Sequence, residues 1–433
     1  MRIVLLTPGT GNFLCGSCLR DNALARELTA LGHDAMIAPL YLPFALEDQD
    51  AEVAERVVRM GGINVYLQQK LPALRFLPRF LHDWLDSPRL LRWAASRSNM
   101  TGASGLGALT LSVLRGEEGR QRAEVEQLAS WLATLPRPDV VVLSNALLIG
   151  MARELGARLG CPVLCTLQGE APFLDSLPEP HRAACWSLLA ERAGDVAAFL
   201  PVSRYTADLM GERLGLDPSR VHTVWNGIDP TDFDAPAPER GDRPPTVGYL
   251  ARMCRDKGLA TLFDAFLLVK ERIPATRLDA AGVVLGEDRE LVASLERRAR
   301  ELGIAADASF RADVSRAQKI ELLRGCDVFS VPATYGESFG LYLLEALASG
   351  VPVVAPRHGG SPEIVTDTGG GLLCEPDDPA SLANALCELL LDRPRARALG
   401  EAGRAAVRER FTAVRMARDV ERVCRMAADP SRA

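Results

Sequence analysis

The sequence predicts an α/β protein built from two doubly wound parallel sheets. Short, continuous apolar runs alternate along the chain with amphipathic stretches of helical length. Strands that are apolar on both faces are typical of parallel sheets covered by helices on each side. The chain has 433 residues, which is too long for one ordinary core and suits two domains.

Composition is that of a globular protein and excludes several other classes. The net charge is −6, so no overall basic field attracts nucleic acid. No apolar run reaches the length of about 18 residues that a membrane span needs. The apolar start leads directly into a Gly-rich loop, so we expect a buried first strand rather than a signal peptide. The ten cysteines are scattered, which indicates reduced thiols and a cytoplasmic protein.

The first half of the chain predicts the strands of one sheet. The first strand, at residues 3–6, is followed by a glycine-containing loop and a helix at residues 19–31, which Gly32 ends. Short runs rich in apolar residues predict further strands at residues 34–39, 140–143, 163–166, 198–201 and 221–225.

The second half predicts another sheet after a break in the pattern. Residues 234–245 are rich in Pro and charge and are unsuited to a packed element, so we expect domains at residues 1–235 and 236–412. A last helix at residues 413–428 follows a further break. Strands of the second sheet are predicted at residues 246–250, 276–281, 308–310, 328–331 and 351–355.

One segment, residues 335–356, says more about chemistry than any other. Glu337 precedes a predicted helix, and Glu345 lies within it, eight residues later. The glycine-containing loop that leads into this helix leaves backbone N–H groups free to meet an anion. Carboxylates beside such a site would repel the anion and would instead accept hydrogen bonds from hydroxyls. An anion and hydroxyls on one ligand suggest a nucleotide sugar.

This segment closely resembles the donor site of the retaining glycosyltransferases of family 4, which have the GT-B fold. The family pattern is Glu, seven residues and Glu, with Phe-Gly just after the first Glu, and Glu337, Phe339, Gly340 and Glu345 match it. The likeness covers most of the chain from about Pro201. It implies two Rossmann-like domains, the acceptor on the first, the donor on the second, and a C-terminal helix (residues 413–433) that returns to the first domain.

The resemblance implies roles for residues of the second domain. Glu345 would accept hydrogen bonds from the ribose hydroxyls, and its apolar neighbours make an unpaired carboxylate costly there. Glu337 would face the hydroxyls of the donor sugar. The backbone of Phe339, Gly340 and Leu341 would receive the phosphates.

Two cations follow the predicted strand at residues 246–250. Arg252 and Lys257 precede a helix and can clamp a diphosphate and stabilise charge on a leaving nucleotide. Cations in such a loop are often only solvated charge, but their spacing, with Gly258 next, matches the phosphate-binding Arg and Lys of the family. Arg311, after the strand at residues 308–310, matches the region where relatives grip the nucleobase.

The loop after the first strand, residues 9–18, corresponds to a glycine loop that in the family closes on donor phosphates or the acceptor, and we assign Gly11 to this role. Cys15 and Cys18 in this loop have Cys-x-x-Cys spacing. No second Cys/His pair at metal-ligand spacing accompanies them, so we interpret both as small loop residues. A reactive thiol pair is the second interpretation.

The chain departs from the family after the strand at residues 163–166. Many relatives have a His there that contacts the donor sugar, whereas this chain has Gln168. Gln168 can hydrogen-bond a sugar hydroxyl but cannot carry a proton near neutral pH. Glu170 is a nearby carboxylate that would be available in its place.

The resemblance implies front-face substitution with retention, in which the leaving phosphate helps to deprotonate the acceptor. We therefore expect a hexosyltransferase that uses a UDP-, GDP- or ADP-sugar, with no metal and no other cofactor. The acceptor stays open between a saccharide and a lipid-linked molecule. The alternatives are a catalytically weak sugar-nucleotide-binding protein, a GT-B isomerase or a phosphorylase.

Residues 71–98 interleave basic and aromatic side chains at helical spacing. Such a stretch can lie on an anionic membrane, which would make the protein peripheral to the cytoplasmic face. The simpler interpretation is a surface helical hairpin over the first domain. The residues concerned are Phe76, Phe80, Trp84, Trp93, Arg75, Arg79, Arg89, Arg92 and Arg97.

Overall fold

The computed structural model of the protein describes residues 1–8, 16–40, 103–233 and 243–429. The chain divides into two compact units, Met1–Trp225 with Ala413–Ala433, and Asn226–Thr412. Within the described ranges, each unit has one sheet, and all of its paired strands are parallel, as the sequence predicts. Gly11, Cys15 and the segment at residues 71–98 lie outside the described residues.

The first unit holds a five-stranded sheet in the order β2-β1-β3-β4-β5. Each of these strands begins and ends within one residue of its predicted bounds. They are β1 (Arg2–Thr7), β2 (Asp34–Pro39), β3 (Val140–Leu143), β4 (Val163–Leu167) and β5 (Ala198–Pro201). Among the described residues, the helices of this unit are α1 (Gly16–Ala30), α5 (Ala103–Leu114), α6 (Arg122–Thr134), α7 (Ala152–Leu159), α8 (Glu170–Asp175), α9 (His181–Arg192), α10 (Arg204–Leu214) and α18 (Ala413–Ala428).

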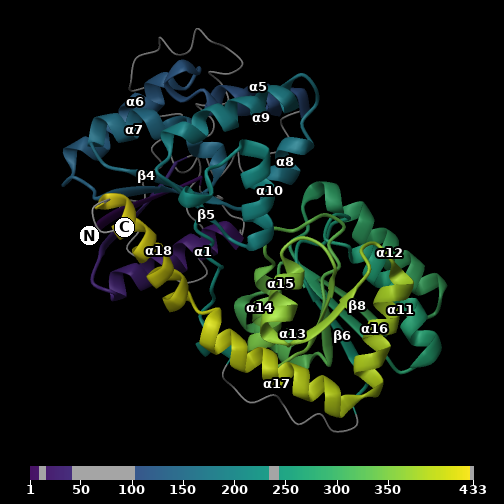
Figure 1. Cartoon of the computed structure of the whole chain (residues 1–433). Helices are drawn as coiled ribbons and strands as arrows, with labels where there is room; N and C mark the ends of the chain where they lie inside the picture. The colour runs from purple at the N-terminus through teal and green to yellow at the C-terminus, as the bar shows by residue number, and fades with distance from the viewer. Residues whose placement is uncertain (9–15, 41–102, 234–242, 430–433) are drawn as a thin grey trace. The chain divides into compact units, whose positions relative to one another are not determined.

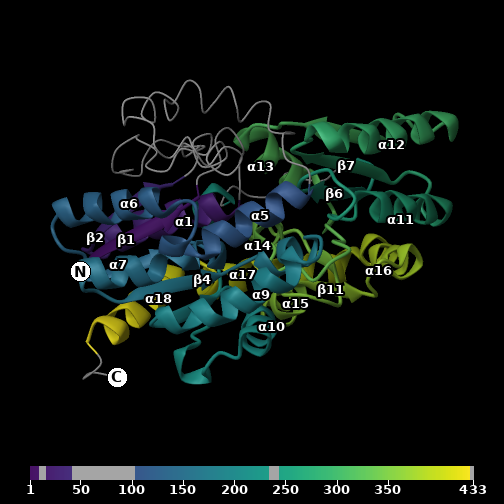
Figure 2. The ribbon, with the colours of Figure 1, turned by 90° about the horizontal axis from the view of Figure 1, so that it is seen from above.

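Both faces of this sheet are buried, which explains the continuous apolar strands. Ile3 and Leu5 belong to a core cluster that includes residues of α1 and α18. Val4 and Leu6, which point to the opposite face, belong to a second cluster with residues of α6, α7 and α9. Helix α18, at the C-terminal end of the chain, therefore completes the core of the first unit beside α1 (Figure 1 and Figure 2).

The predicted strand at residues 221–225 is wrong. Val221 forms only an isolated bridge with Phe199 at the edge of the sheet. The segment follows β5 through two backbone hydrogen bonds, from His222 to Phe199 (2.9 Å) and from Val224 to Pro201 (2.9 Å), without making a ladder. The apolar pattern therefore predicts a strand where the chain forms only a bridge at the edge of the sheet.

The second unit holds a six-stranded sheet in the order β11-β10-β9-β6-β7-β8. Its strands are β6 (Thr246–Leu250), β7 (Arg277–Gly282), β8 (Ala308–Ala312), β9 (Val328–Ser330), β10 (Val353–Pro356) and β11 (Gly371–Cys374), the last of which the sequence analysis missed. Its helices are α11 (Leu259–Arg272), α12 (Arg289–Glu301), α13 (Arg316–Gly325), α14 (Leu341–Ala348), α15 (Ser361–Thr368), α16 (Pro379–Leu391) and α17 (Arg393–Arg410).

The second unit begins at Asn226, earlier than the predicted boundary at residues 235 and 236. The backbone of Ile228 donates to the carbonyl of Phe411 (2.9 Å), and Ile228 forms a bridge with Thr412. These bonds tie residues 226–233 to the end of the second unit, although they precede the Pro-rich stretch. None of the helices in the described part of the chain is long and apolar enough to span a bilayer.

Candidate active site

The strand order of the second unit reverses between β6 and β9. β6 is followed in sequence by β7 on one side, whereas β9 and β10 lie on its other side. In open parallel sheets, ligands bind outside the carboxyl ends of the strands at such a switch point. The loops that leave β6 and β9, residues 251–258 and 331–340, contain Arg252, Lys257 and Glu337.

These two loops pack so closely that one contact point requires glycine. Gly258 has φ +71°, and a Cβ there would lie 1.8 Å from the carbonyl oxygen of Pro332. The backbone N–H of Thr334 donates to the carbonyl of Asp256 (2.9 Å). The loop after β10 joins them, because the N–H of Gly360 donates to the carbonyl of Glu337 (2.7 Å). These contacts therefore hold together the three loops that follow β6, β9 and β10.

Lys257 and Glu337, which the sequence predicts for one site, form an ion pair there. The ammonium contacts Oε1 of Glu337, and the hydroxyl of Tyr342 donates to Oε2. The side chains of Lys257 and Glu337 are only 18% and 15% exposed. The ammonium also lies 5.2 Å and 5.6 Å from the ring centres of Tyr335 and Tyr342.

The environment fixes the protonation states of this cluster. Burial alone would lower the pKa of Lys257, but the charges of Glu337 and Tyr335 and the hydrogen bonds to them together outweigh burial and raise the pKa above its ordinary value. Burial, together with the charge of Glu337, raises the pKa of Tyr342 well above its usual range. Lys257 is therefore a cation and Tyr342 a hydrogen-bond donor, which together leave Glu337 as the acceptor between them.

Glu345 has a partner that sequence reasoning did not find. Its Oε1 pairs with the ammonium of Lys319 from helix α13, and both side chains are largely buried. Burial among Leu343, Leu344 and Leu347 signalled that this carboxylate needs a partner. Which cation meets it depends on the packing of α13 beside α14, and local sequence does not specify that.

The remaining residues predicted for the donor site hold other positions. Arg252 pairs with Glu287 and with Asp288 rather than with the Lys257–Glu337 pair. Arg311 on β8 forms two hydrogen bonds with Asp279 on β7 (3.1 Å and 2.7 Å).

In the segment from Phe339 to Leu341, the side chain of Phe339 is buried, and the backbone at Gly340 turns into helix α14. Phe339 is buried, with its ring centre 6.4 Å from that of Phe411. Gly340 has φ +97° and precedes helix α14, whose first residue is Leu341. The backbone at this helix start is thereby turned in a way that only glycine adopts readily.

In the first unit, Gln168 lies in a hydrogen-bonded network at the carboxyl edge of the sheet. Its side-chain amide donates to the carbonyl of Ser144 (2.6 Å), and its side-chain oxygen accepts from the hydroxyl of Ser17 (2.9 Å). Ser144 in turn donates to the buried carboxylate of Asp21. Burial raises the pKa of Asp21, although the neighbouring Arg20 opposes this shift.

Glu170, which the sequence offers as a carboxylate close to Gln168, is engaged by the backbone. It is 2% exposed, and its two oxygens accept the backbone N–H groups of Ala146 (2.8 Å) and Gln168 (2.7 Å). Burial raises its pKa despite these hydrogen bonds. Glu170 therefore joins the loops after β3 and β4.

Among the described residues, no group of three or more His, Cys, Asp or Glu side chains is placed to hold a metal ion.

Two family models match the chain. Residues 231–406 match "Glycosyl transferases group 1", and residues 107–232 match "Glycosyltransferase Family 4". A GDP-mannose-dependent alpha-(1-6)-phosphatidylinositol monomannoside mannosyltransferase from Mycolicibacterium smegmatis is 32% identical over 60% of this chain and 68% of its own length. A D-inositol 3-phosphate glycosyltransferase from Corynebacterium kroppenstedtii is 34% identical over 55% of each chain.

Solved structures share the fold over almost the whole chain. HepE from Anabaena in complex with UDP superposes with a TM-score of 0.67 at 16% identity and covers 98% of this chain and 99% of its own. Sucrose-phosphate synthase from Thermosynechococcus elongatus gives a TM-score of 0.68 at 18% identity, with the same coverage. At these identities the likeness is one of fold.

Proposed function

This chain belongs to glycosyltransferase family 4 and has the GT-B fold, and we propose that it moves a hexose from a nucleoside-diphosphate sugar to an acceptor hydroxyl with retention of configuration. The observation that carries this proposal is the Lys257–Glu337 pair at the switch point of the second unit. A cation suited to a diphosphate and a carboxylate suited to sugar hydroxyls meet there on adjacent loops.

In the proposed reaction the diphosphate attracts the ammonium of Lys257, and Tyr342 keeps its hydrogen bond to Glu337. The other carboxylate oxygen is then available to a hydroxyl of the donor sugar. The bond from the anomeric carbon to the phosphate oxygen breaks, and the acceptor oxygen bonds to that carbon on the same face. The acceptor proton passes to the leaving phosphate, whose charge Lys257 stabilises.

GDP-mannose is the donor that we propose first, and an acceptor with an inositol phosphate group is the matching acceptor. Several relatives at 30–35% identity are described as GDP-mannose-dependent mannosyltransferases of phosphatidylinositol monomannoside. Others are described as D-inositol 3-phosphate glycosyltransferases. An inositol phosphate is common to both descriptions.

Thermal shift with GDP-mannose, UDP-glucose and ADP-glucose tests the donor class. A ligand at about 100 times its Kd stabilises the folded protein by about 2.7 kcal/mol, so the true donor raises Tm by several degrees. The product of transfer to phosphatidylinositol or inositol phosphate should keep the α configuration in its proton NMR spectrum. Binding of nucleoside diphosphates without transfer to any acceptor would instead favour a sugar-nucleotide-binding protein.

The two carboxylates should have separable effects on ligand affinity. Glu345→Gln is expected to weaken binding of the free nucleoside diphosphate and of the intact donor alike, by about 10- to 100-fold, because the ribose is common to both ligands. Glu337→Gln should weaken only the intact donor, since only that ligand carries the sugar. Calorimetric titration of both ligands into both variants measures the difference. Equal losses for Glu337→Gln with the two ligands would contradict the assignment to the sugar.

A further inference from the structure

Arg252 is held at two of its nitrogens by neighbouring carboxylates of one short loop. Its Nε donates to Oδ2 of Asp288 (2.7 Å), and its Nη2 donates to Oε1 of Glu287. Both acids belong to the 3-10 turn Gly286–Asp288, which precedes helix α12. Burial alone would lower the pKa of Arg252, but its hydrogen bonds to Asp288 and Glu287 outweigh this and raise it.

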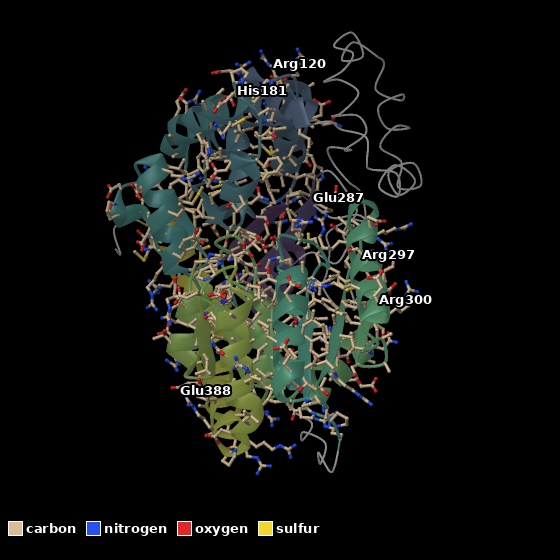
Figure 3. All side chains as sticks on the ribbon, turned by 90° about the vertical axis from the view of Figure 1, so that its right-hand side faces the viewer. Arg120, His181, Glu287, Arg297, Arg300 and Glu388 are labelled. Carbon is tan, nitrogen blue, oxygen red and sulfur yellow. The ribbon has the colours of Figure 1, made fainter. Side chains whose placement is uncertain are left out.

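The two carboxylates differ in how they are held. The side chain of Asp288 is 8% exposed and also accepts the backbone N–H of Leu285 (3.3 Å), so its position is fixed by the turn itself. The side chain of Glu287 is 65% exposed and lies at the end of α12 that is remote from Arg297 and Arg300 (Figure 3). An exposed partner of this kind exchanges readily with solvent and ligands.

A diphosphate would be bound best by two parallel N–H groups of the guanidinium. In the structure, Nη2 of Arg252 donates to Glu287 and Nε donates to Asp288. We propose that Glu287 competes with the donor diphosphate for Arg252, whereas Asp288 is a positioning residue that keeps the guanidinium directed while the diphosphate replaces Glu287. This inference rests on the proposed function and on the diphosphate-binding role that the family resemblance implies for Arg252.

The first test compares two glutamate-to-glutamine variants that change charge equally. Glu287→Gln should tighten binding of the nucleoside diphosphate by about two- to fivefold, the range expected for an exposed ion pair. Glu290→Gln is the matched control, because Glu290 is exposed, lies three residues further on and pairs with Arg297 (2.7 Å). The Glu290→Gln variant should bind the nucleoside diphosphate with the affinity of the wild type. The measurement is calorimetry with GDP, UDP and ADP at low ionic strength, where surface pairs are least screened.

A double-mutant cycle links the effect to Arg252. Arg252→Ala alone should weaken binding of the nucleoside diphosphate by about 10-fold or more. In that background Glu287→Gln should bring no gain, because the group for which it competes is gone. Asp288→Asn should weaken binding of the nucleoside diphosphate by less than Arg252→Ala does, because the guanidinium is still present but is no longer directed. In the Arg252→Ala background Asp288→Asn should bring no further loss of affinity, whereas a merely structural role would lower Tm and affinity in both backgrounds.

The outcomes separate this inference from the proposed function. Glu287 is not a competitor if its Gln variant binds no more tightly than the Glu290 control, or if the gain persists without Arg252. Asp288 is not a positioning residue if its Asn variant keeps the wild-type Kd for the nucleoside diphosphate, or if its loss of affinity persists without Arg252. A wild-type protein that binds none of the three nucleoside diphosphates overturns the proposed function and this inference together.

Discussion

Lys257→Ala is expected to reduce sugar transfer by at least about 100-fold, because one preorganised group that stabilises developing charge contributes about that much. The variant removes the cation that faces Glu337 at the switch point. It also leaves Glu337 with Tyr342 as its remaining partner in this cluster, and a half-buried carboxylate without its counter-ion costs about 1–3 kcal/mol. Initial rates and chemical denaturation measure the two effects.

Lys270→Ala provides the matched control for this variant. Lys270 is a lysine of the same unit with a similarly buried side chain, and it pairs with Asp307 (2.7 Å). It also donates to the carbonyl of Pro274 (2.7 Å). Its removal should cost comparable stability while transfer stays near the wild-type rate. Similar activity in the Lys257 and Lys270 variants would exclude Lys257 from the reaction.

Glu170→Ala should lower the stability of the protein more than any other single change considered for the first unit. It leaves the buried N–H groups of Ala146 and Gln168 without their acceptor, at about 1–3 kcal/mol each. A total of about 2–6 kcal/mol corresponds to a fall in Tm of roughly 5–20 °C for a unit of this size. Thermal and urea denaturation, followed by circular dichroism, measure this loss.

The control for this change is Glu154→Ala on helix α7 of the same unit. Glu154 forms an i,i+4 pair with Arg158 (3.5 Å) near the surface, so its loss should cost less than about 1 kcal/mol. If Glu170→Ala yields no folded protein, Glu170→Gln serves, because it keeps the size of the side chain and one acceptor oxygen. Melting of the Glu170→Gln variant within one degree of the wild type would show that these backbone groups do not depend on the carboxylate.

Most of the fold follows from local sequence because buried parallel strands are apolar on both faces. Runs such as residues 140–143 and 246–250 match β3 and β6 residue for residue. β11 (Gly371–Cys374) was missed because three glycines precede a run of only three apolar residues. The sequence at residues 221–225 predicts a strand wrongly, because its apolar pattern lies beside the edge strand β5, where it forms only an isolated bridge.

The candidate site could be predicted in its residues but not in its pairings. The spacing of Glu337 and Glu345, and the loop with Lys257, can be read directly from the sequence. The cation that meets each carboxylate is set by contacts between distant elements, as between α13 and α14 for Lys319 and Glu345. The closeness of Glu170 to Gln168 in the sequence made it a candidate for the sugar, whereas its burial and two backbone partners make it a structural residue.

Helix α18 gives the first unit an unusual order of assembly. Met416, Val420 and Val423 fill the same core cluster as Ile3 and Leu5 of the first strand. During synthesis, that face of the sheet stays open to solvent until the second unit has already been made. The core of the first unit is therefore completed only once the second unit has been synthesised, through contacts between segments far apart in the sequence, which form slowly. Deletion of α18 would expose the apolar face of the sheet that Met416, Val420 and Val423 cover.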